Sequence, residues 1–286
     1  MISFIILNYK SFKDTTECIN SINRIKTDKE KSIIVVDNNS MTPLEKKEIL
    51  NYTNDIVLLD ENLGFAKGNN IGCKYAIDKY NPDFLVVINS DTVIEQKDFI
   101  DKIYELYDKY NFDMMGPKIL PSDSDSCNPF KAYQTLEEVN NRINYTKKLI
   151  FIYQNFILRN LLKLYIKTKR IFVKPDKPKN GLIDKLNIPL HGCSLIFSRK
   201  YYEKFDDIFY NDTFLYHEEE FLYLRCKNNN LISLYSPELE IIHKEGQSLN
   251  KLYNNYKKEI FRNKEILKSL ELLKKEMENQ EVNYEN

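Results

Sequence analysis

The chain has 286 residues, of which 42% are hydrophobic and 29% are charged, as expected for a globular protein with a substantial core. Its 42 basic and 42 acidic side chains balance, so the sequence lacks the basic excess that marks a nucleic-acid-binding protein. The five cysteines are scattered and form no C-x-x-C pair, which argues against a disulfide framework or a zinc cluster and favours a reducing cytoplasmic environment.

Short apolar runs alternate with amphipathic segments in the first part of the chain. The apolar runs predict buried strands at Ile2–Leu7, Ser32–Val36, Ile56–Leu59 and Phe84–Ile88, and a further short strand is predicted at Met114–Leu120. Helical spacing of apolar residues predicts helices at Thr15–Ile25 (with Asp14 as N-cap), Pro43–Leu50, Gly64–Lys79 and Phe99–Tyr110. This alternation predicts parallel strand pairing and an α/β fold. No apolar run is long enough for a membrane span, and the first is too short for a signal peptide.

The pattern changes after Pro121. A polar loop is predicted at Ser122–Ser126, and a weakly helical segment at Leu136–Thr146. Residues 146–174 then carry eight basic side chains and no acidic one, among many Ile, Leu, Phe and Tyr residues, before a break at 175–181. The remaining predicted elements are strands at Ile188–Ser198, Leu231–Tyr235 and Leu239–Ile242, a loop entering a helix at Phe214–Lys227, and a Lys- and Glu-rich helix from Lys251 onward.

Polar side chains follow three of the predicted strands, beginning with Asn8, Asp37 and Asn89. Because the carboxyl ends of parallel strands meet at one edge of a sheet, these residues predict one shared site. Asp37 could accept hydrogen bonds from a base or a ribose, or it could close an ordinary turn. Asp91, two residues after Asn89, could hold a divalent cation that shares its other ligands with substrate phosphates, or it could cap a turn.

Three of the seven glycines lie at positions 64, 68 and 72, beside several amide side chains and Lys67. A helix that begins here would direct free N–H groups at an anion, and Lys67 would supply charge for a phosphate. The alternative is that the glycines let the helix pack closely, which would leave the neighbouring polar residues unexplained. Neither G-x-G-x-x-G nor the P-loop pattern is present, which argues against a dinucleotide-binding dehydrogenase and a P-loop NTPase.

An acidic triplet, Glu218 to Glu220, follows His217 and is flanked by aromatic residues on both sides. A carboxylate that aromatic neighbours partly desolvate has a raised pKa, which suits a general base. A solvated acidic helix face is the alternative. His243 ends another predicted strand, where it could contact a metal or a diphosphate.

In their order along the chain, these stretches resemble the family 2 glycosyltransferases of the GT-A fold, especially the bacterial rhamnosyltransferase-like branch. The matching stretches are Val35–Ser40, Asn62–Gly72, Leu85–Thr92, Gly192–Arg199, Phe214–Arg225 and His243–Ser248, with Arg262–Asn263 near the end. The resemblance covers roughly 1–120 and 186–265, whereas 121–185 resembles no family that we can name. It implies a Rossmann-like, mostly parallel sheet with a mixed extension on the acceptor side and a C-terminal helix.

The resemblance also implies roles for individual residues. Asp91 stands in the family's D-x-D-type motif, where the first acid is replaced by Asn89, so Asp91 and His243 would hold Mg²⁺ or Mn²⁺. Glu219 would be the catalytic base, as a Glu in place of the usual Asp, with Glu218 and Glu220 as alternatives. The residues implied in substrate binding are Asn8, Asp37, Asn39, Asn62, Gly64, Lys67, Gly68, Asn69, Asn70, Asn89, Gly192 and Arg225.

The implied function is inverting transfer of a sugar, such as rhamnose, from a nucleoside-diphosphate donor to a glycan or lipid-linked acceptor in cell-surface polysaccharide synthesis. The implied single catalytic domain comprises a nucleotide-sugar half at 1–120, a basic helical insert at 121–185, an acceptor half at 186–250 and a helix at 251–286. Two alternatives are a sugar-phosphate nucleotidylyltransferase and a non-catalytic nucleotide-sugar-binding or scaffold protein. We expect a cytoplasmic protein, and the basic segment 146–174 would either contact the inner face of the membrane or form a solvated insert.

Overall fold

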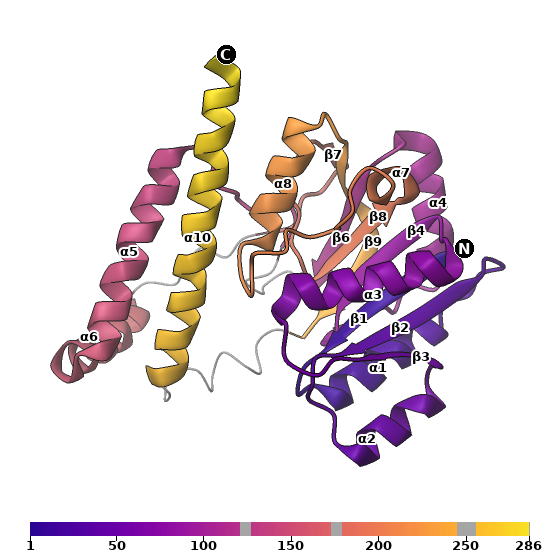
Figure 1. The fold of residues 1–286 in the computed structure, drawn as a ribbon, viewed down its shortest axis with the longest axis horizontal. Coiled ribbons are helices and arrows are strands. Elements are labelled where there is room, and N and C mark those ends of the chain that lie inside the picture. Colours follow the sequence, from indigo (N-terminus) through magenta and orange to yellow (C-terminus); the bar gives the residue numbers. More distant parts are fainter. Residues whose placement is uncertain (121–126, 173–178, 245–255, 286) are drawn as a thin grey trace. The chain divides into compact units, whose positions relative to one another are not determined.

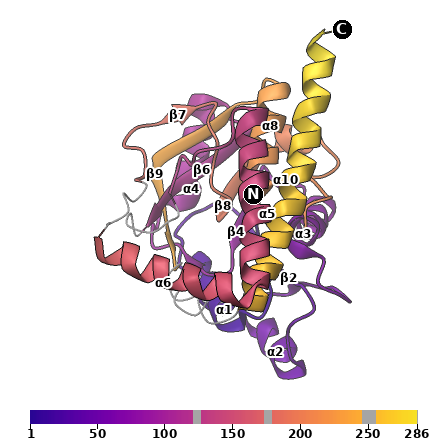
Figure 2. The same ribbon diagram turned by 90° about the vertical axis from the view of Figure 1, so that its left-hand side faces the viewer.

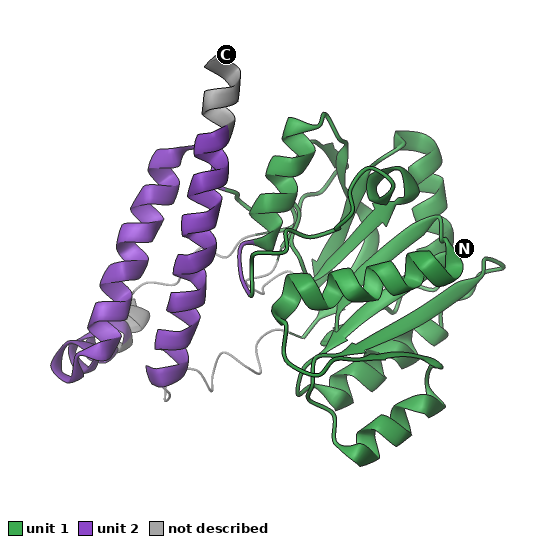
Figure 3. Cartoon of the chain, viewed as in Figure 1, with its two compact units in different colours: residues 1–132, 178–214, 218–245 green, residues 133–177, 215–217, 246–286 purple. Residues whose placement is uncertain are grey.

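The computed structural model describes residues 1–120, 127–172, 179–244 and 256–285, with side chains at 167–172 and 280–285 left out (Figures 1 and 2). The chain forms two compact units (Figure 3). Unit 1 comprises 1–132, 178–214 and 218–245, and unit 2 comprises 133–177, 215–217 and 246–286. All the predicted site residues belong to unit 1. Within the described ranges, no helix combines the length and the apolar character needed to cross a membrane.

The first half of unit 1 is the parallel α/β arrangement that the sequence predicts. Its strands are β1 (Ile2–Asn8), β2 (Lys31–Asp37), β3 (Asp55–Leu58) and β4 (Phe84–Asn89), in the order β3-β2-β1-β4. Its helices are α1 (Phe12–Asn23), α2 (Pro43–Glu48, followed by a 3-10 turn at Ile49–Asn51), α3 (Gly64–Tyr80) and α4 (Phe99–Tyr110). The register pairs Asn8 with Asp37 and Leu7 with Asn89, so three polar strand ends meet at one edge.

The second half of unit 1 extends the sheet with mixed pairing. It adds β5 (Thr92–Val93), β6 (Met114–Leu120), β7 (Lys185–Leu186), β8 (Ser194–Ser198) and β9 (Ser233–His243), with helices α7 (Arg199–Tyr202) and α8 (Glu218–Asn228). β8 runs antiparallel to β4 and to β6, whereas β6 and β9 are parallel. The predicted α/β fold with a mixed extension is therefore confirmed.

Several predicted boundaries are wrong. Helix α1 begins at Phe12, so Asp14 lies in its first turn instead of capping it. The predicted strand at 188–198 is a strand only from Ser194, because Pro189 and Gly192 interrupt the run. The two strands predicted at 231–235 and 239–242 form the single strand β9. Its pairing with β6 is irregular, because Pro117 of β6 pairs with Ser236 and the next residue, Lys118, pairs with Glu240. The skipped residues include Pro237, which has no N–H to donate to the ladder.

Helices cover the sheet of unit 1 on both faces. Alternate residues of β1 point to opposite faces, so Phe4 and Ile6 pack with α1 and α4, while Ile5 packs with α3 and α8. Figure 1 shows α3 lying along β1 and β2 on one face. The two faces together form an extensive core, as the composition predicts.

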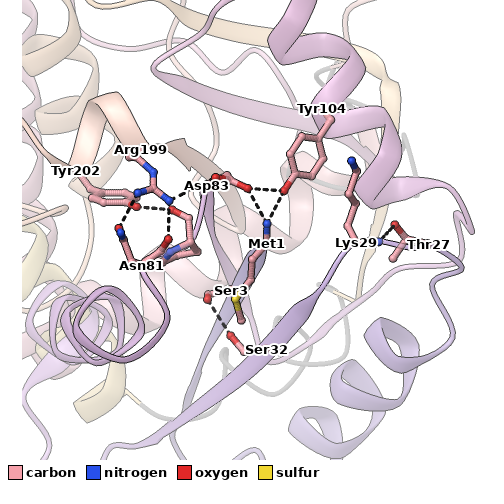
Figure 4. A network of polar contacts seen from close by, with 11 residues as sticks. Met1, Ser3, Thr27, Lys29, Ser32, Asn81, Asp83, Tyr104, Arg199 and Tyr202 are labelled. Atoms are coloured by element: carbon pink, nitrogen blue, oxygen red, sulfur yellow. Dashed lines mark hydrogen bonds and ion pairs between the residues drawn. The ribbon is translucent and has the colours of Figure 1, made fainter.

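A polar network joins the amino-terminal ends of the parallel strands (Figure 4). The amino group of Met1 donates to Asp83 Oδ2 at 2.6 Å and to Tyr104 Oη at 2.8 Å. Arg199 donates to Asn81 Oδ1 at 2.8 Å and lies 3.4 Å from an Asp83 oxygen. The network ties β1 to β4 at the edge opposite the predicted site, so we interpret it as structural.

Unit 2 is helical and brings distant parts of the sequence together. It contains α5 (Leu136–Gln154), α6 (Phe156–Phe172) and α10 (Tyr256–Glu285). Helices α5 and α10 run side by side in both views, with Val139 and Ile143 buried on α5, and Ile266, Leu270 and Leu273 buried on α10 (Figures 1 and 2). The predicted basic insert and C-terminal helix thus share a single core. The polar loop predicted at 122–126 and most of the break at 175–181 lie outside the described residues.

Candidate active site

A buried carboxylate, that of Asp37, lies where β1 and β2 end. Asp37 is fully buried, and its Oδ1 accepts hydrogen bonds from Asn8 Nδ2 at 3.1 Å and from Ser40 N at 3.0 Å. Met41 N adds a bond to Oδ2 at 3.1 Å. These bonds fix the loop after β2. They are the contacts expected if Asp37 closes a turn. The structure brings Asn8 and Asp37 together, as predicted.

Asn38, which the sequence prediction did not assign, joins this loop to the start of α3. Its side chain accepts from Leu63 N at 2.8 Å and donates to Gly64 O at 3.0 Å. Asn62 Oδ1 accepts from Gly64 N at 3.0 Å. Gly64 has φ +82°, and a Cβ there would lie 2.3 Å from Phe214 O, so no larger residue fits. Asn39, which the resemblance places in substrate binding, donates from its Nδ2 to Asp60 O at 2.7 Å.

The glycines inside α3 serve close packing. A Cβ at Gly68 would lie 2.6 Å from Leu7 Cδ1, and one at Gly72 would lie 2.7 Å from side-chain carbons of Ile5 and Val36. The packing explanation therefore accounts for these two glycines. It does not account for Lys67, which is exposed in the first turn of α3 and is available to a ligand.

The two asparagines of α3 differ in how fully they are bonded. Asn70 exchanges hydrogen bonds with the Phe209 backbone at 2.9 and 2.8 Å and donates to Asn211 Oδ1 at 2.8 Å, so it holds the loop around 209–211. Asn69 Nδ2 donates to Phe65 O at 3.0 Å, whereas its buried Oδ1 has no partner within the described residues.

Asp91 follows β4 and meets the end of β9. Its Oδ1 lies 3.2 Å from Nε2 of His243, whose side chain is buried. Burial pushes the pKa of Asp91 up, but the hydrogen bond and charge of His243 and the charge of Lys244 outweigh burial and hold it below the ordinary value. The backbone N–H of Asn89 donates to Cys193 O at 2.8 Å, which joins the end of β4 to the loop before β8. The predicted metal residues Asp91 and His243 are thus neighbours.

The loop before β8 links Asp91 to the acidic triplet. The ring of His191 lies edge-on to the ring of His243, with centroids 6.1 Å apart, and His191 Nδ1 accepts from Cys193 N at 3.2 Å. The next residue, Gly192, donates its N–H to Glu219 Oε1 at 3.1 Å. A Cβ on Gly192 would lie 2.7 Å from that oxygen. Residues 191–192 therefore lie between the two candidate chemical groups, and the sequence prediction had not assigned His191.

The three acids of the triplet have different environments at the start of α8. Glu218 and Glu220 are buried, whereas Glu219 is partly exposed. Burial, together with the nearby charges of Glu219 and Glu220, raises the pKa of Glu218 to about 8. Glu218 Oε1 has no hydrogen-bond partner in the described part of the chain. Of the three, Glu219 is the acid that is both accessible and held by a backbone donor.

Arg225, further along the same helix α8, supports a loop. Its Nη1 donates to the carbonyl oxygens of Asp207 at 2.7 Å and Ile208 at 2.8 Å, and its guanidinium lies 4.7 Å from the centroid of the Phe205 ring. The loop it holds is the one that Asn70 also contacts. Within the described structure, Arg225 therefore has the contacts of a residue that positions this loop.

The protein groups near Asp91 fit a cation that shares its ligands with a substrate. No cluster of three or more His, Cys, Asp or Glu residues suitable for a metal occurs among the residues described. Asp91 and His243 offer one carboxylate and one imidazole, so a bound cation would take most of its ligands from water and phosphate oxygens. Mg²⁺ is commonly bound in this way beside nucleotide phosphates.

Comparison with known proteins identifies relatives of the chain. The model of glycosyl transferase family 2 matches residues 3–205, more than half of the chain. A curated relative is the low-salt glycan biosynthesis hexosyltransferase Agl10 of Haloferax volcanii, which is 31% identical over 121 residues. That match spans 42% of this chain and 36% of Agl10.

The structure of residues 1–349 of TarS from S. aureus is similar in fold. Its TM-score is 0.52 at 18% identity, with 87% of this chain and 62% of that chain covered. The TarS structure in complex with UDP-GlcNAc gives a TM-score of 0.52 at 18% identity, with 88% and 61% covered. At this identity the likeness concerns the fold, and it confirms the predicted GT-A fold.

Proposed function

The chain belongs to glycosyl transferase family 2, and from this we propose that it transfers a hexosyl group from a nucleoside-diphosphate sugar to a hydroxyl group, with inversion of configuration. The observation that carries the proposal is the arrangement around residues 191–192. On one side lies Asp91 with His243, and on the other lies Glu219, bonded to the Gly192 N–H at 3.1 Å. A site for a diphosphate and a site for a base thus adjoin the same loop.

Glu219 is the base in this proposal. It accepts the proton of the acceptor hydroxyl as that oxygen forms a bond to the anomeric carbon, and the bond from that carbon to the diphosphate oxygen breaks. Glu219 is partly exposed, so an acceptor can reach it. Its neighbours suit this role less well, because Glu218 and Glu220 are buried.

Asp91 and His243 would hold Mg²⁺ or Mn²⁺ in this proposal. When bound, the ion neutralises charge on the departing nucleoside diphosphate. Lys67 is exposed at the start of α3 and would add a positive charge for the same phosphates. Asn8, Asp37, Asn38 and Asn62 contribute indirectly, since their hydrogen bonds fix the loops that would enclose the nucleotide.

The relatives suggest which donors and acceptors to test first. TarS has been solved with UDP and with UDP-GlcNAc, so uridine nucleotides are the first donors to test. A nucleoside-diphosphate rhamnose should be included because of the sequence resemblance. Agl10 is a hexosyltransferase of glycan biosynthesis, which supports a glycan acceptor. A lipid-linked acceptor in polysaccharide synthesis, at the cytoplasmic face of the membrane, is proposed from the sequence resemblance.

The proposal is tested by incubating the protein with a panel of nucleotide sugars and measuring the nucleoside diphosphate released, with and without MgCl₂ or MnCl₂. We expect one donor to be turned over in a cation-dependent manner and to raise the melting temperature. Thermal stabilisation by a donor without any release, even with candidate acceptors present, would instead support a non-catalytic binding protein.

A further inference from the structure

One apolar face of α6 in unit 2 is exposed. Ile157 is 68% exposed, Leu161 57%, Leu164 60% and Tyr165 58%. Their spacing of four, three and one residues places all four side chains on one side of a helix. Single exposed apolar residues are common, but a continuous row over two turns is a feature of binding surfaces.

The neighbouring side of α6, about 100° further around the helix, packs within unit 2. Leu158, Leu162 and Ile166 are partly buried, and Leu162 and Ile166 line a small pocket with Tyr153 and Tyr256. The guanidinium of Arg159 lies 4.0 Å from the centroid of the Tyr256 ring. Among the described residues, helix α6 therefore has two apolar rows, one packed inside the unit and the other exposed.

The segment that carries the exposed row is strongly basic, although the chain as a whole has no net charge. Residues 146–174 contain eight basic residues and no acidic one. Lys147 pairs with Glu271 at 3.1 Å, while Lys148 and Lys163 are exposed. The side chains of Lys167, Lys169, Arg170 and Lys174 lie outside the described residues, but their charges belong to the same segment.

We propose that α6 is a membrane-docking helix that lies on an anionic lipid bilayer. Ile157, Leu161, Leu164 and Tyr165 would enter the boundary between head groups and acyl chains, and the basic residues would contact the anionic head groups. A second copy of the chain is a less suitable occupant, because pairing two α6 faces would bring two segments of like charge together. The inference rests on the proposed function in one respect, that a lipid-linked acceptor would be presented at such a surface.

The chain contains no tryptophan, which makes a direct test possible. Leu164→Trp places a single reporter in the exposed row, and Leu44→Trp places one in α2, where Leu44 is 79% exposed, as a matched control. With vesicles of phosphatidylcholine and phosphatidylglycerol, we expect the emission of Leu164→Trp to shift to the blue and that of Leu44→Trp to stay unchanged. The shift should be weaker in high salt and absent with pure phosphatidylcholine.

Co-sedimentation tests the same inference without a reporter. Leu161→Ser with Leu164→Ser should lower vesicle binding by about tenfold or more, because two leucine side chains no longer enter the bilayer, while Leu44→Ser should not change it. Equal binding by the double variant, an unshifted emission from Leu164→Trp, or self-association through α6 in sedimentation without lipid would overturn the inference. Donor turnover without lipid is a separate readout, so the two proposals can fail independently.

Discussion

The backbone N–H of Gly192 donates to Oε1 of Glu219 at 3.1 Å, and a Cβ on Gly192 would lie 2.7 Å from the same oxygen. We therefore expect Gly192→Ala to displace the Glu219 carboxylate. The clash is with the end of a flexible side chain, so the fold should tolerate it, whereas the transfer rate should fall by about 100-fold, as expected for a misplaced catalytic group. The measurement is kcat with the donor identified by the panel.

The control for this prediction is thermal unfolding together with donor affinity. Both should stay close to the wild-type values in Gly192→Ala, because the altered contact involves only the base. An unchanged kcat would show that the position of Glu219 has no bearing on turnover.

Glu218 should make stability depend on pH. In the unfolded chain this carboxyl ionises near its ordinary pKa of 4.5, whereas burial and the neighbouring acids raise its folded pKa to about 8. Between these values the folded state holds more protons, so the free energy of unfolding falls as pH rises. Glu218→Gln removes this loss, and we expect it to stabilise the protein by on the order of 1–3 kcal/mol at pH 8.

The check is a melting-temperature profile for both proteins. The curves should coincide below pH 4.5 and separate as pH rises toward 8. If the two proteins differ by the same amount at every pH, the effect of the substitution is packing, and Glu218 is not the titrating group.

Asp91 should link nucleotide binding to the divalent cation. Asp91→Ala removes the carboxylate beside His243, and we expect Mg²⁺-dependent binding of a nucleoside diphosphate to weaken about tenfold or more, since a charged contact contributes about 1.5–3 kcal/mol. Calorimetric titration with and without Mg²⁺ measures this. Asp78→Ala, which removes an exposed aspartate from α3, is the matched control. Equal cation dependence in all three proteins would remove Asp91 from the metal site.

The packing glycines and the exposed lysine of α3 should separate stability from donor binding. Gly72→Ala places a Cβ 2.7 Å from side-chain carbons of Ile5 and Val36, both of which are buried, so we expect a loss of about 1–3 kcal/mol in unfolding free energy. A Gly72→Ala protein as stable as wild type would contradict the close packing of α3 on the sheet.

Lys67→Ala should leave the midpoint of urea unfolding unchanged and weaken donor binding.

Much of the parallel half of unit 1 could be predicted because its elements are defined locally. The run Phe84–Ile88 reads as a buried strand from its side chains alone, and helix α4 has the predicted bounds of Phe99 and Tyr110. The strand ends Asn8, Asp37 and Asn89 meet as expected because parallel pairing fixes their register.

The remaining features depend on contacts between distant residues. Nothing near Gly192 in the sequence indicates that its N–H binds Glu219, and the proximity of His191 to His243 arises only when β9 returns along β6 and β5. The roles of Gly68, Asn70 and Arg225 were likewise predicted as substrate binding, whereas the structure gives each a packing or loop-holding contact.

The sequence also does not predict that the basic insert packs against the C-terminal helix. Residues 121–185 and 251–286 were predicted as separate parts, yet α5 and α10 form the core of unit 2. The apolar pattern of α10 indicated that one face would be buried, but an amphipathic helix does not specify its partner.

The most direct test of the central claim is the comparison of Glu219→Gln with wild type in donor binding and in turnover. Calorimetry should give donor affinities that agree within a few-fold, because Gln keeps the shape of the side chain and can still accept from the Gly192 N–H. The transfer rate should fall by about 10²–10⁴-fold, the usual contribution of a general base. A wild-type transfer rate in Glu219→Gln would contradict the assignment of Glu219 as the base and, with it, the proposed arrangement of the site.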